Sequence, residues 1–264
     1  MKIIFFKIII LFFTCSAIGC VDSDITKSPS KKTIKTITLS YAFAKNLIKK
    51  GDKYFSDPIT IDRVKKALKL YERVSNSNIM LLESFWKASM ACAFLSEHNR
   101  KEKLKSYYAK NGAEYAKIGI NIDDNSAECH YFYAINLGLY ADIHRFEALK
   151  LLSVMEKEAL KAIKLKPKLD YAGGYRFLGR LYFDAPEFLI GDVKKGLSFL
   201  KKACELSPEY PPNLLDYSKA LIEVNKKEIA RKYLTKILLI KKLKRENNFL
   251  SLWKKKAKKL LSKL

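Results

Sequence analysis

Residues 175–208 decide the fold, and they read YRFLGRLYFDAPEFLIGDVKKGLSFLKKACELSP. Apolar and small side chains recur there every three or four residues, which is the period of an α-helix with one buried face. Gly179 in the first segment lets a second helix approach closely, and Gly196 and Ala203 in that second segment let a following unit stack. Pro208 ends the second helix, because proline has no amide hydrogen to donate. The stretch therefore predicts two helices packed side by side.

This unit resembles the tetratricopeptide repeat, a helix–turn–helix of about 34 residues. The same spacing recurs more loosely in four other places, residues 47–74, 85–116, 134–167 and 214–237. We therefore predict an all-α, tetratricopeptide-like solenoid of about five degenerate helical pairs over residues 41–240. Extra residues lengthen the predicted loops at 56–61 and 186–192. The loop at 186–192 is either an exposed loop with three apolar residues or a lid folded over the concave groove of the solenoid.

The composition indicates a folded helical chain with an unusual charge. Among the 264 residues, 48% are hydrophobic, and only 10 Gly and 7 Pro interrupt the chain. The net charge of +24 can signal contact with nucleic acid or an anionic membrane. Solvated helix faces and a codon bias toward lysine would produce the same excess. Nucleic acid is not expected as a partner, because the N-terminus carries an address for export.

That address is the first twenty residues, which have the layout of a secretory signal peptide. A positively charged start precedes an apolar run at residues 8–13, which is short for a membrane span. Gly19 before Cys20 resembles a bacterial lipobox, in which the cysteine carries a lipid anchor, although Ala17 stands where leucine is usual. An ordinary cleaved signal and an uncleaved anchor are the alternatives. We predict a lipoprotein signal peptide over residues 1–20, with Cys20 as the lipid anchor.

The next segment and the other cysteines carry little chemistry. Residues 21–40 are polar and rich in Ser, Thr, Lys and Asp, so we predict a flexible tether. Cys92, Cys129 and Cys204 are an odd number at wide spacing, which indicates neither a disulfide framework nor a metal site. We expect them to be buried as small hydrophobic residues.

A longer motif runs from residue 170 to residue 192. It contains Gly-Gly, then Arg-Phe-Leu-Gly-Arg-Leu-Tyr, then Ala-Pro, then Gly-Asp, and a Pro-Pro-Asn step follows at 211–213. This motif resembles the T component of TRAP transporters, a family of tetratricopeptide lipoproteins, over residues 41–240. The resemblance implies a periplasm-facing bacterial lipoprotein that binds a periplasmic solute-binding protein, assists uptake of a small hydrophobic ligand and forms homotrimers. The alternative is a general scaffold for envelope protein assembly that binds peptides without small-molecule cargo.

The first helix of each pair lines the concave surface of a solenoid, and residues three or four apart share one helix face. Ten side chains are predicted to line this surface and bind a ligand or partner: Trp86, Met90, Phe132, Ile135, Leu139, Arg176, Arg180, Phe183, Leu215 and Lys219. The set is apolar with a cationic end. Burial in the core is the alternative for Phe132, Ile135 and Leu139.

The cationic end of this set contains a pair of arginines. Arg176 and Arg180 lie one helical turn apart, where two guanidinium groups suit an anion such as a carboxylate. The alternative is structural, with Arg176 paired to Asp170 or Asp192 so that it holds the loop at 186–192 in place.

Residues 241–264 are predicted to form a basic amphipathic helix. Apolar residues recur there at intervals of three and four, and lysines fill the other sides. The helix could cap the last repeat or adsorb to anionic lipid, and both roles are compatible.

The sequence contains no recognisable catalytic motif. His98, His130 and His144 lack partners at metal-ligand spacing, and neither a phosphate-binding loop nor a nucleophile elbow is present. We expect a protein that is not an enzyme and that has neither a metal nor a cofactor.

Overall fold

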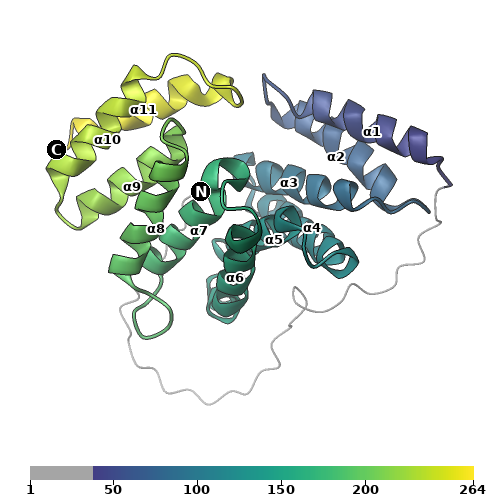
Figure 1. Ribbon diagram of the computed structural model, residues 1–264, viewed down its shortest axis with the longest axis horizontal. Coiled ribbons are helices and arrows are strands. Elements are labelled where there is room, and N and C mark those ends of the chain that lie inside the picture. The colour runs from purple at the N-terminus through teal and green to yellow at the C-terminus, as the bar shows by residue number, and fades with distance from the viewer. Residues whose placement is uncertain (1–37) are drawn as a thin grey trace.

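The computed structural model describes residues 38–264, which contain eleven α-helices, one 3-10 helix and no β-strand (Figure 1). The α-helices are α1 (Tyr41–Tyr54), α2 (Ile61–Ser75), α3 (Leu82–His98), α4 (Glu102–Ile122), α5 (Ala127–Ala141), α6 (Arg145–Leu165), α7 (Leu169–Asp184), α8 (Val193–Leu206), α9 (Pro211–Glu223), α10 (Lys227–Leu239) and α11 (Leu250–Leu261). The 3-10 helix η1 (Asn247–Phe249) precedes α11. The prediction of an all-α solenoid of helical pairs is confirmed. The predicted signal peptide and the lipid-anchor role of Cys20 lie outside the described residues.

Ten of the helices form five consecutive pairs, from α1 with α2 to α9 with α10, and each pair packs against the next. The odd-numbered helices also contact one another in succession, α3 with α5, α5 with α7 and α7 with α9. The helices α3, α5, α7 and α9 therefore form a continuous inner row. Residues on the odd-numbered helices are consequently the ones that can face a common interior space.

Close approach between the two helices of a pair depends on missing side chains. A Cβ atom added to Gly179 on α7 would lie 2.6 Å from Cγ of Leu200 on α8. One added to Gly196 on α8 would lie 2.8 Å from the backbone nitrogen of Phe183. Leu178 and Leu200 are fully buried beside these glycines. Glycine is needed at both positions because the two backbones lie too close for a side chain between them.

Several helix ends are capped by residues that the sequence places there. The side chains of Ser40, Thr60, Ser126 and Asp192 accept hydrogen bonds from the first turns of α1, α2, α5 and α8. Such caps satisfy amide groups that have no partner within the helix. The predicted burial of the three cysteines is confirmed, since Cys92, Cys129 and Cys204 are free and buried.

The C-terminal helix packs against the last repeat as a cap. Ala257 of α11 is fully buried, and Trp253, Leu260 and Leu261 pack against the apolar cluster of α9 and α10. The helix is shorter than the predicted 241–264, since α11 covers only Leu250–Leu261. Within residues 38–264, no helix is both long enough and apolar enough to cross a membrane.

Residues 240–249, which we call the clasp, connect α10 to α11 and return to the first repeat. The side chain of Asn248 donates to the carbonyl of Ile59 at 3.0 Å and accepts from the amide of Ile59 at 3.3 Å. The amide of Asn247 donates to Asp57 at 3.3 Å. Figure 1 shows the connection between α10 and α11 beside the one between α1 and α2. The clasp thus joins the two ends of the repeat array.

Candidate ligand-binding site

A cavity of about 230 Å³ lies between the inner helices and the clasp. Side chains from α3, α5, α7 and α9 form its walls, and the clasp, α11 and Phe55 at the end of α1 contribute the remaining side. Every helix of the inner row therefore reaches the same space. This arrangement follows from the repeat, because each first helix turns the same face inward.

Seven of the ten predicted concave residues line this cavity: Met90, Phe132, Ile135, Arg176, Arg180, Leu215 and Lys219. Trp86 lies behind the wall, stacked on Phe132 with ring centroids 6.4 Å apart. Leu139 is buried against Ala93 and Ala109 instead of facing the cavity. Phe183 packs against the core of the last repeats. The structure thus brings most of the set together, and binding by these residues stays a prediction.

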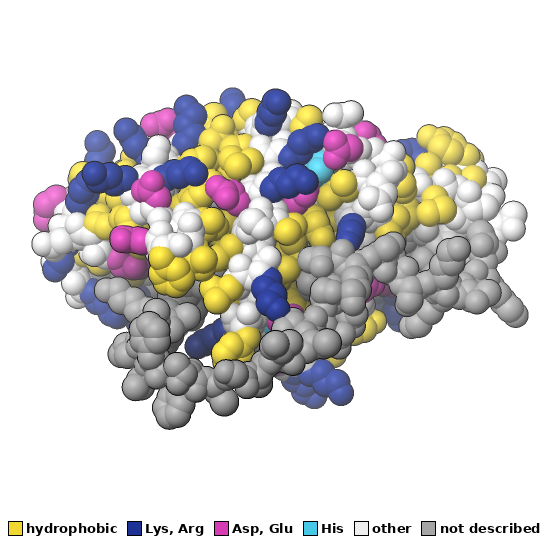
Figure 2. Space-filling view, turned by 90° about the horizontal axis from the view of Figure 1, so that it is seen from below, with side chains coloured by type: hydrophobic (Ala, Val, Ile, Leu, Met, Phe, Trp, Pro, Cys, Tyr) yellow, Lys and Arg dark blue, Asp and Glu magenta, His cyan; other side chains and the backbone are white. Residues whose placement is uncertain are grey.

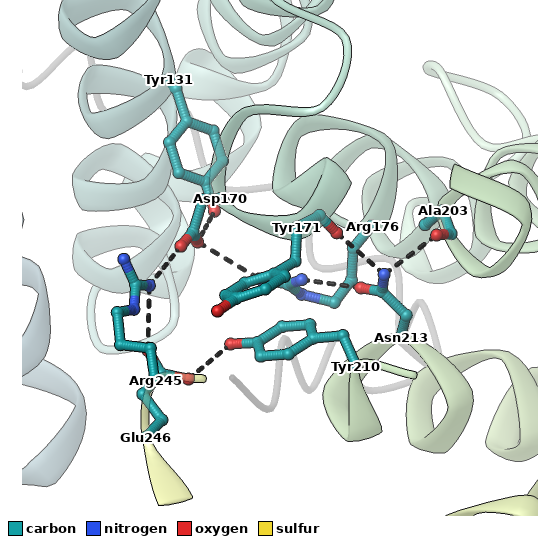
Figure 3. Close-up of polar contacts among 9 residues, drawn as sticks. All are labelled: Tyr131, Asp170, Tyr171, Arg176, Ala203, Tyr210, Asn213, Arg245 and Glu246. Carbon is teal, nitrogen blue, oxygen red and sulfur yellow. Dashed lines mark hydrogen bonds and ion pairs between the residues drawn. The ribbon is translucent and has the colours of Figure 1, made fainter. Parts of the chain in front are cut away.

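Asp170, at the start of α7, is the polar centre of the site (Figure 3). Its carboxylate lies 2.6 Å from Arg245 of the clasp and 3.7 Å from Arg176, and it accepts a hydrogen bond from the Tyr131 hydroxyl at 2.8 Å. Burial favours the protonated acid, but Arg245 and Arg176 outweigh burial and lower the pKa of Asp170. The carboxylate is therefore charged at neutral pH and holds three different elements together.

The backbone at Asp170 is bent into a left-handed turn. The φ angles of Asp170, Tyr171 and Ala172 are 47°, 55° and 61°, a region that costs non-glycine residues about 1–2 kcal/mol each. The turn aims the Asp170 carboxylate at Arg245 and lays the Tyr171 ring on Tyr210, with centroids 4.3 Å apart. Strain of this kind persists where surrounding contacts over-determine the backbone, often at binding sites.

Asn213 at the start of α9 holds that turn in place. Its amide nitrogen donates to the carbonyls of Tyr171 at 2.9 Å and Ala203 at 3.0 Å. Its amide oxygen accepts from Arg176 at 2.7 Å. These bonds link α7, α8 and α9 around one buried side chain (Figure 3). The Pro-Pro-Asn step in the sequence is therefore a structural joint between repeats.

The two predicted anion-binding arginines are both paired within the protein. Arg176 takes Asp170 as its partner, as the structural alternative proposed, but not Asp192, which caps α8. Arg180 lies 2.7 Å from Asp184. Burial raises the pKa of Asp184 to about 7 even though Arg180 acts to lower it. Asp216 also interacts with Arg180: burial acts to raise the pKa of Asp216, but Lys219 and Arg180 help to lower it.

One nitrogen of Arg180 also lacks a partner. Nη1 of Arg180 is buried and donates no hydrogen bond to any described residue. The same is true of Nε of Arg245. A buried donor without an acceptor costs about 1–3 kcal/mol. A ligand that supplies an acceptor at these atoms would recover that cost. The arginines thus keep some capacity for an anion despite their internal partners.

Aromatic rings form the wall opposite the inner helices. Phe249 of the clasp lies 6.2 Å from Phe94 and 5.3 Å from His98, measured between ring centroids. Trp253 of α11 lies 6.0 Å from Tyr210. Sequence reasoning missed these residues, as it missed Tyr131, Asp170 and Arg245 as part of the site. Nothing in the local pattern could have shown that the C-terminus returns to the cavity.

The loop at residues 186–192 does not act as a lid. None of its residues lines the cavity, and Phe188 is 72% exposed. Ile190 packs against the core formed by α5, α6 and α7. The cavity is covered instead by the clasp, 50 residues further along the chain. Across residues 38–264, no three or more His, Cys, Asp and Glu side chains gather in a group able to hold a metal ion.

Comparison with known proteins identifies the family. A family model described as regulator of microtubule dynamics protein 1-3 matches residues 47–188, which is just over half of the chain. The chain belongs to this family. The matched residues run from α1 to the loop after α7 and include the α3, α5 and α7 walls of the cavity. The α9 wall, the clasp and α11 lie beyond them.

Two mammalian relatives agree with this match. Regulator of microtubule dynamics protein 3 of mouse is 29% identical over 169 residues, which is 56% of this chain and 35% of the relative. The rat protein of the same name gives the same identity and coverage. The matched part is about a third of the relatives' length, so it does not represent the whole of either protein.

A solved structure supports the fold. The crystal structure of a thermophilic tetratricopeptide protein from Thermus thermophilus aligns with a TM-score of 0.59 and 16% identity. It covers 83% of this chain and 99% of that protein. At this identity the likeness concerns the fold alone.

The family overturns the predicted transport function. The assignment to the TRAP transporter T component is wrong, and so are the bacterial envelope location, the periplasmic lipoprotein and the role beside a solute-binding protein. The motif misled because its residues serve packing. A Cβ atom added to Gly174 would lie 2.5 Å from Cγ2 of Ile163, and one added to Gly179 would lie 2.6 Å from Cγ of Leu200. Neither position has room for a side chain. Any close-packed helical pair needs such residues, whatever the protein binds.

Proposed function

We propose that this chain is a binding module and not an enzyme, and that its cavity takes an amphiphile with an apolar body and an anionic head group. In a protein of the regulator of microtubule dynamics family, such a module would act by binding and would transform no substrate. The observation that carries the proposal is the position of Arg180. The buried Nη1 atom of this cation has no hydrogen-bond partner among the described residues, and the side chain lines the same cavity as the apolar wall.

The apolar body would lie against α3 and α5. Met90, Phe132 and Ile135 line that part of the cavity, and the aromatic rings of Phe94 and Phe249 stand nearby. Removing an apolar side chain or methylene group from water contributes about 0.8 kcal/mol per CH₂. A cavity of about 230 Å³ is narrow, which suits a single alkyl chain better than a folded partner.

The head group would lie near Arg180 and Lys219. Lys219 extends from α9 and pairs with Asp216 at 2.8 Å, and its side chain is 36% exposed. Arg180 offers the unpartnered Nη1. Hydrogen bonds from an ionised donor to a carboxylate or phosphate are about twice as strong as neutral ones. An anionic head group would accept a hydrogen bond from a donor that has no acceptor within the described protein.

The relatives' names describe regulators of microtubule dynamics. We propose that this chain contributes to the same kind of process through its binding module. Occupancy of the cavity would stabilise the closed array, since a ligand that binds only the folded state adds to its stability. The closed array would then present its outer surface to other components.

The test compares two ligands that differ in the head group alone. The 264-residue chain, freed of bound lipid, is titrated with dodecanoate and with dodecanol in competition with a dansyl-labelled fatty acid. Dodecanoate is expected to bind about tenfold more tightly, because one charge-assisted hydrogen bond contributes about 1.5–3 kcal/mol. Equal binding of the two ligands, or no displacement by either, would overturn the proposal.

Variants locate the binding. Arg180→Met should remove the preference for dodecanoate, and Ile135→Trp should weaken both ligands by filling the cavity. Arg231→Met is the matched control, since Arg231 lies on α10 outside the cavity and is exposed. A preference for dodecanoate that survives in Arg180→Met would place the anion elsewhere.

A further inference from the structure

The C-terminal end of the molecule carries most of its excess charge. Residues 226–264, which we call the basic cap, comprise α10, the clasp and α11. They contain thirteen lysines and two arginines against two glutamates, so they hold a net charge of +13 out of +24. This region also lies outside residues 47–188, the part that matches the family. The basic cap is therefore a feature of this chain that the family match does not explain.

The lysines of the basic cap have no acidic partners within the described part of the chain. The two glutamates are engaged by arginines, Glu228 with Arg231 at 3.9 Å and Glu246 with Arg245 at 3.0 Å. None of the thirteen lysines forms an ion pair with residues 38–264. Among like charges of this density, each lysine raises the free energy of its neighbours.

Elsewhere in the described part of the chain, several lysines pair with acidic side chains. Lys161 lies 2.7 Å from Asp124, and Lys166 lies 2.7 Å from Glu128, both pairs joining α6 to the region around α5. On the face seen in Figure 2, magenta Asp and Glu side chains lie among the dark blue Lys and Arg. The cap differs from this face in that its lysines have no acidic side chain paired with them.

The apolar side of α11 is already occupied. Ala257 is fully buried, and Trp253, Leu260 and Leu261 pack on α9 and α10. Insertion of this helix into a lipid layer would require it to leave the last repeat. The outward side presents charge, because Lys255, Lys258, Lys259 and Lys263 are exposed and recur at intervals of three and four. The surface is therefore built for electrostatic contact.

We propose that the basic cap is a docking surface for an acidic, extended polypeptide segment rich in glutamate and aspartate. Charge complementarity carries this assignment, since a partner of opposite sign would neutralise lysines that the chain leaves unpaired. Lysine carries a mobile point charge on a flexible stem, which suits carboxylates whose positions are not fixed, as in an extended segment.

The test measures binding of a fluorescein-labelled oligoglutamate peptide to the 264-residue chain by fluorescence anisotropy. In the cap variant, Lys255, Lys258, Lys259 and Lys263 are each replaced by Gln. In the matched variant, the exposed Lys49, Lys50, Lys65 and Lys69 of α1 and α2 are replaced by Gln. Both variants have the same net charge, so they separate local complementarity from overall attraction.

The cap variant is expected to bind the peptide about tenfold more weakly, since four exposed charge pairs each contribute a small amount. The matched variant should change binding less than the cap variant does, and added salt should weaken binding by the wild type. Equal losses in the two variants would overturn the proposal. So would a preference for phosphatidylserine vesicles or a DNA duplex over oligoglutamate in competition.

Two controls keep the result interpretable. Circular dichroism and thermal unfolding of both variants should match the wild type, because the replaced side chains are exposed. Binding of dodecanoate to the cavity should also be unchanged in the cap variant. A loss of oligoglutamate binding with intact dodecanoate binding would assign the cap a role separate from the cavity.

Discussion

The guanidinium group of Arg245 lies 2.6 Å from the carboxylate of Asp170, although 75 residues separate them in the chain. This ion pair ties the clasp to the first turn of α7. The Asp170 side chain is 16% exposed and the Arg245 side chain 38%, so the acid is the more buried partner. Together with the hydrogen bonds of Asn247 and Asn248 to the first repeat, the contact holds the clasp and its aromatic rings over the cavity.

Replacing Arg245 should loosen the attachment of the clasp to α7. Arg245→Gln leaves the Asp170 carboxylate with Arg176 and Tyr131 alone. A broken buried pair costs about 3–5 kcal/mol, and the solvent exposure of Arg245 reduces this to about 1–2 kcal/mol. Urea unfolding measures the loss. Arg231→Gln, which removes the exposed pair with Glu228, should change stability by less than about 0.5 kcal/mol. Equal effects of the two changes would show that the clasp contact is not stabilising.

Asn248 makes the second contact of the clasp. Asn248→Ala removes both hydrogen bonds to the backbone of Ile59, at a cost of about 1–2 kcal/mol. The clearer readout is hydrogen exchange, which should become faster for the backbone of the clasp and of Ile59 while the helices keep their protection. Asn121→Ala, at an exposed position of α4, is the control. Unchanged exchange in Asn248→Ala would mean that the clasp is held by other contacts.

Substitution of Gly196 tests how closely α7 packs on α8. In Gly196→Ala the new Cβ would lie 2.8 Å from the backbone nitrogen of Phe183 and 2.9 Å from the carbonyl oxygen of Gly179. Backbone atoms cannot move aside as a side chain can, so the helices must separate. Overpacking of this kind costs about 1–3 kcal/mol, against a gain of about 1 kcal/mol in helix propensity. Thermal unfolding should show a lower midpoint, whereas Ser198→Ala on the exposed side of α8 should not. A raised midpoint in Gly196→Ala would contradict the close approach.

His130 gives the fold a predicted dependence on pH. Its Nδ1 is hydrogen-bonded to the buried Glu158, and its Nε2 lies 2.9 Å from the carbonyl of Asp124. Burial disfavours the imidazolium, but Glu158 and Asp124 outweigh burial and raise the pKa of His130. A raised pKa means that the folded state holds the proton more tightly than the unfolded state. The resulting stability is present below about pH 6.5 and is lost as pH rises through the folded-state pKa.

Urea unfolding across this pH range measures that loss. The wild type should become less stable as the pH rises, and His130→Gln should lose this part of the slope. Glu158→Gln should lose it as well, because it removes the group that holds the proton. A slope that persists in both variants would assign the dependence to other residues.

The helical repeat could be predicted from the sequence, and the lining of the cavity could be predicted only in part. Helix periodicity and the small residues Gly179, Gly196 and Ala203 predicted the pairs, because these features act between neighbours in the chain. The same reasoning placed Phe132, Ile135 and Arg176 on the inner face. It failed for Trp86, Leu139 and Phe183, which pack against neighbouring side chains instead of lining the cavity.

The wrong family has a physical explanation of the same kind. The glycines and the Pro-Pro-Asn step that suggested a transport lipoprotein are joints between repeats, as the contacts of Gly179 and Asn213 show. Proteins that stack helical pairs in this way need residues of this kind for close packing. Such residues therefore indicate how the helices pack and do not identify the ligand.

By itself, the amino-acid sequence determined the helices, their pairing and the identity of most inward-facing residues, because those depend on spacing within about forty residues. Only the tertiary structure decided that the array closes, that Arg245, Phe249 and Trp253 complete the cavity, and that the basic cap turns its lysines outward. Those outcomes depend on contacts across the whole ring, such as Asn248 with Ile59. No local pattern specifies where a chain end returns, since that is decided by the accumulated angles of all five pairs.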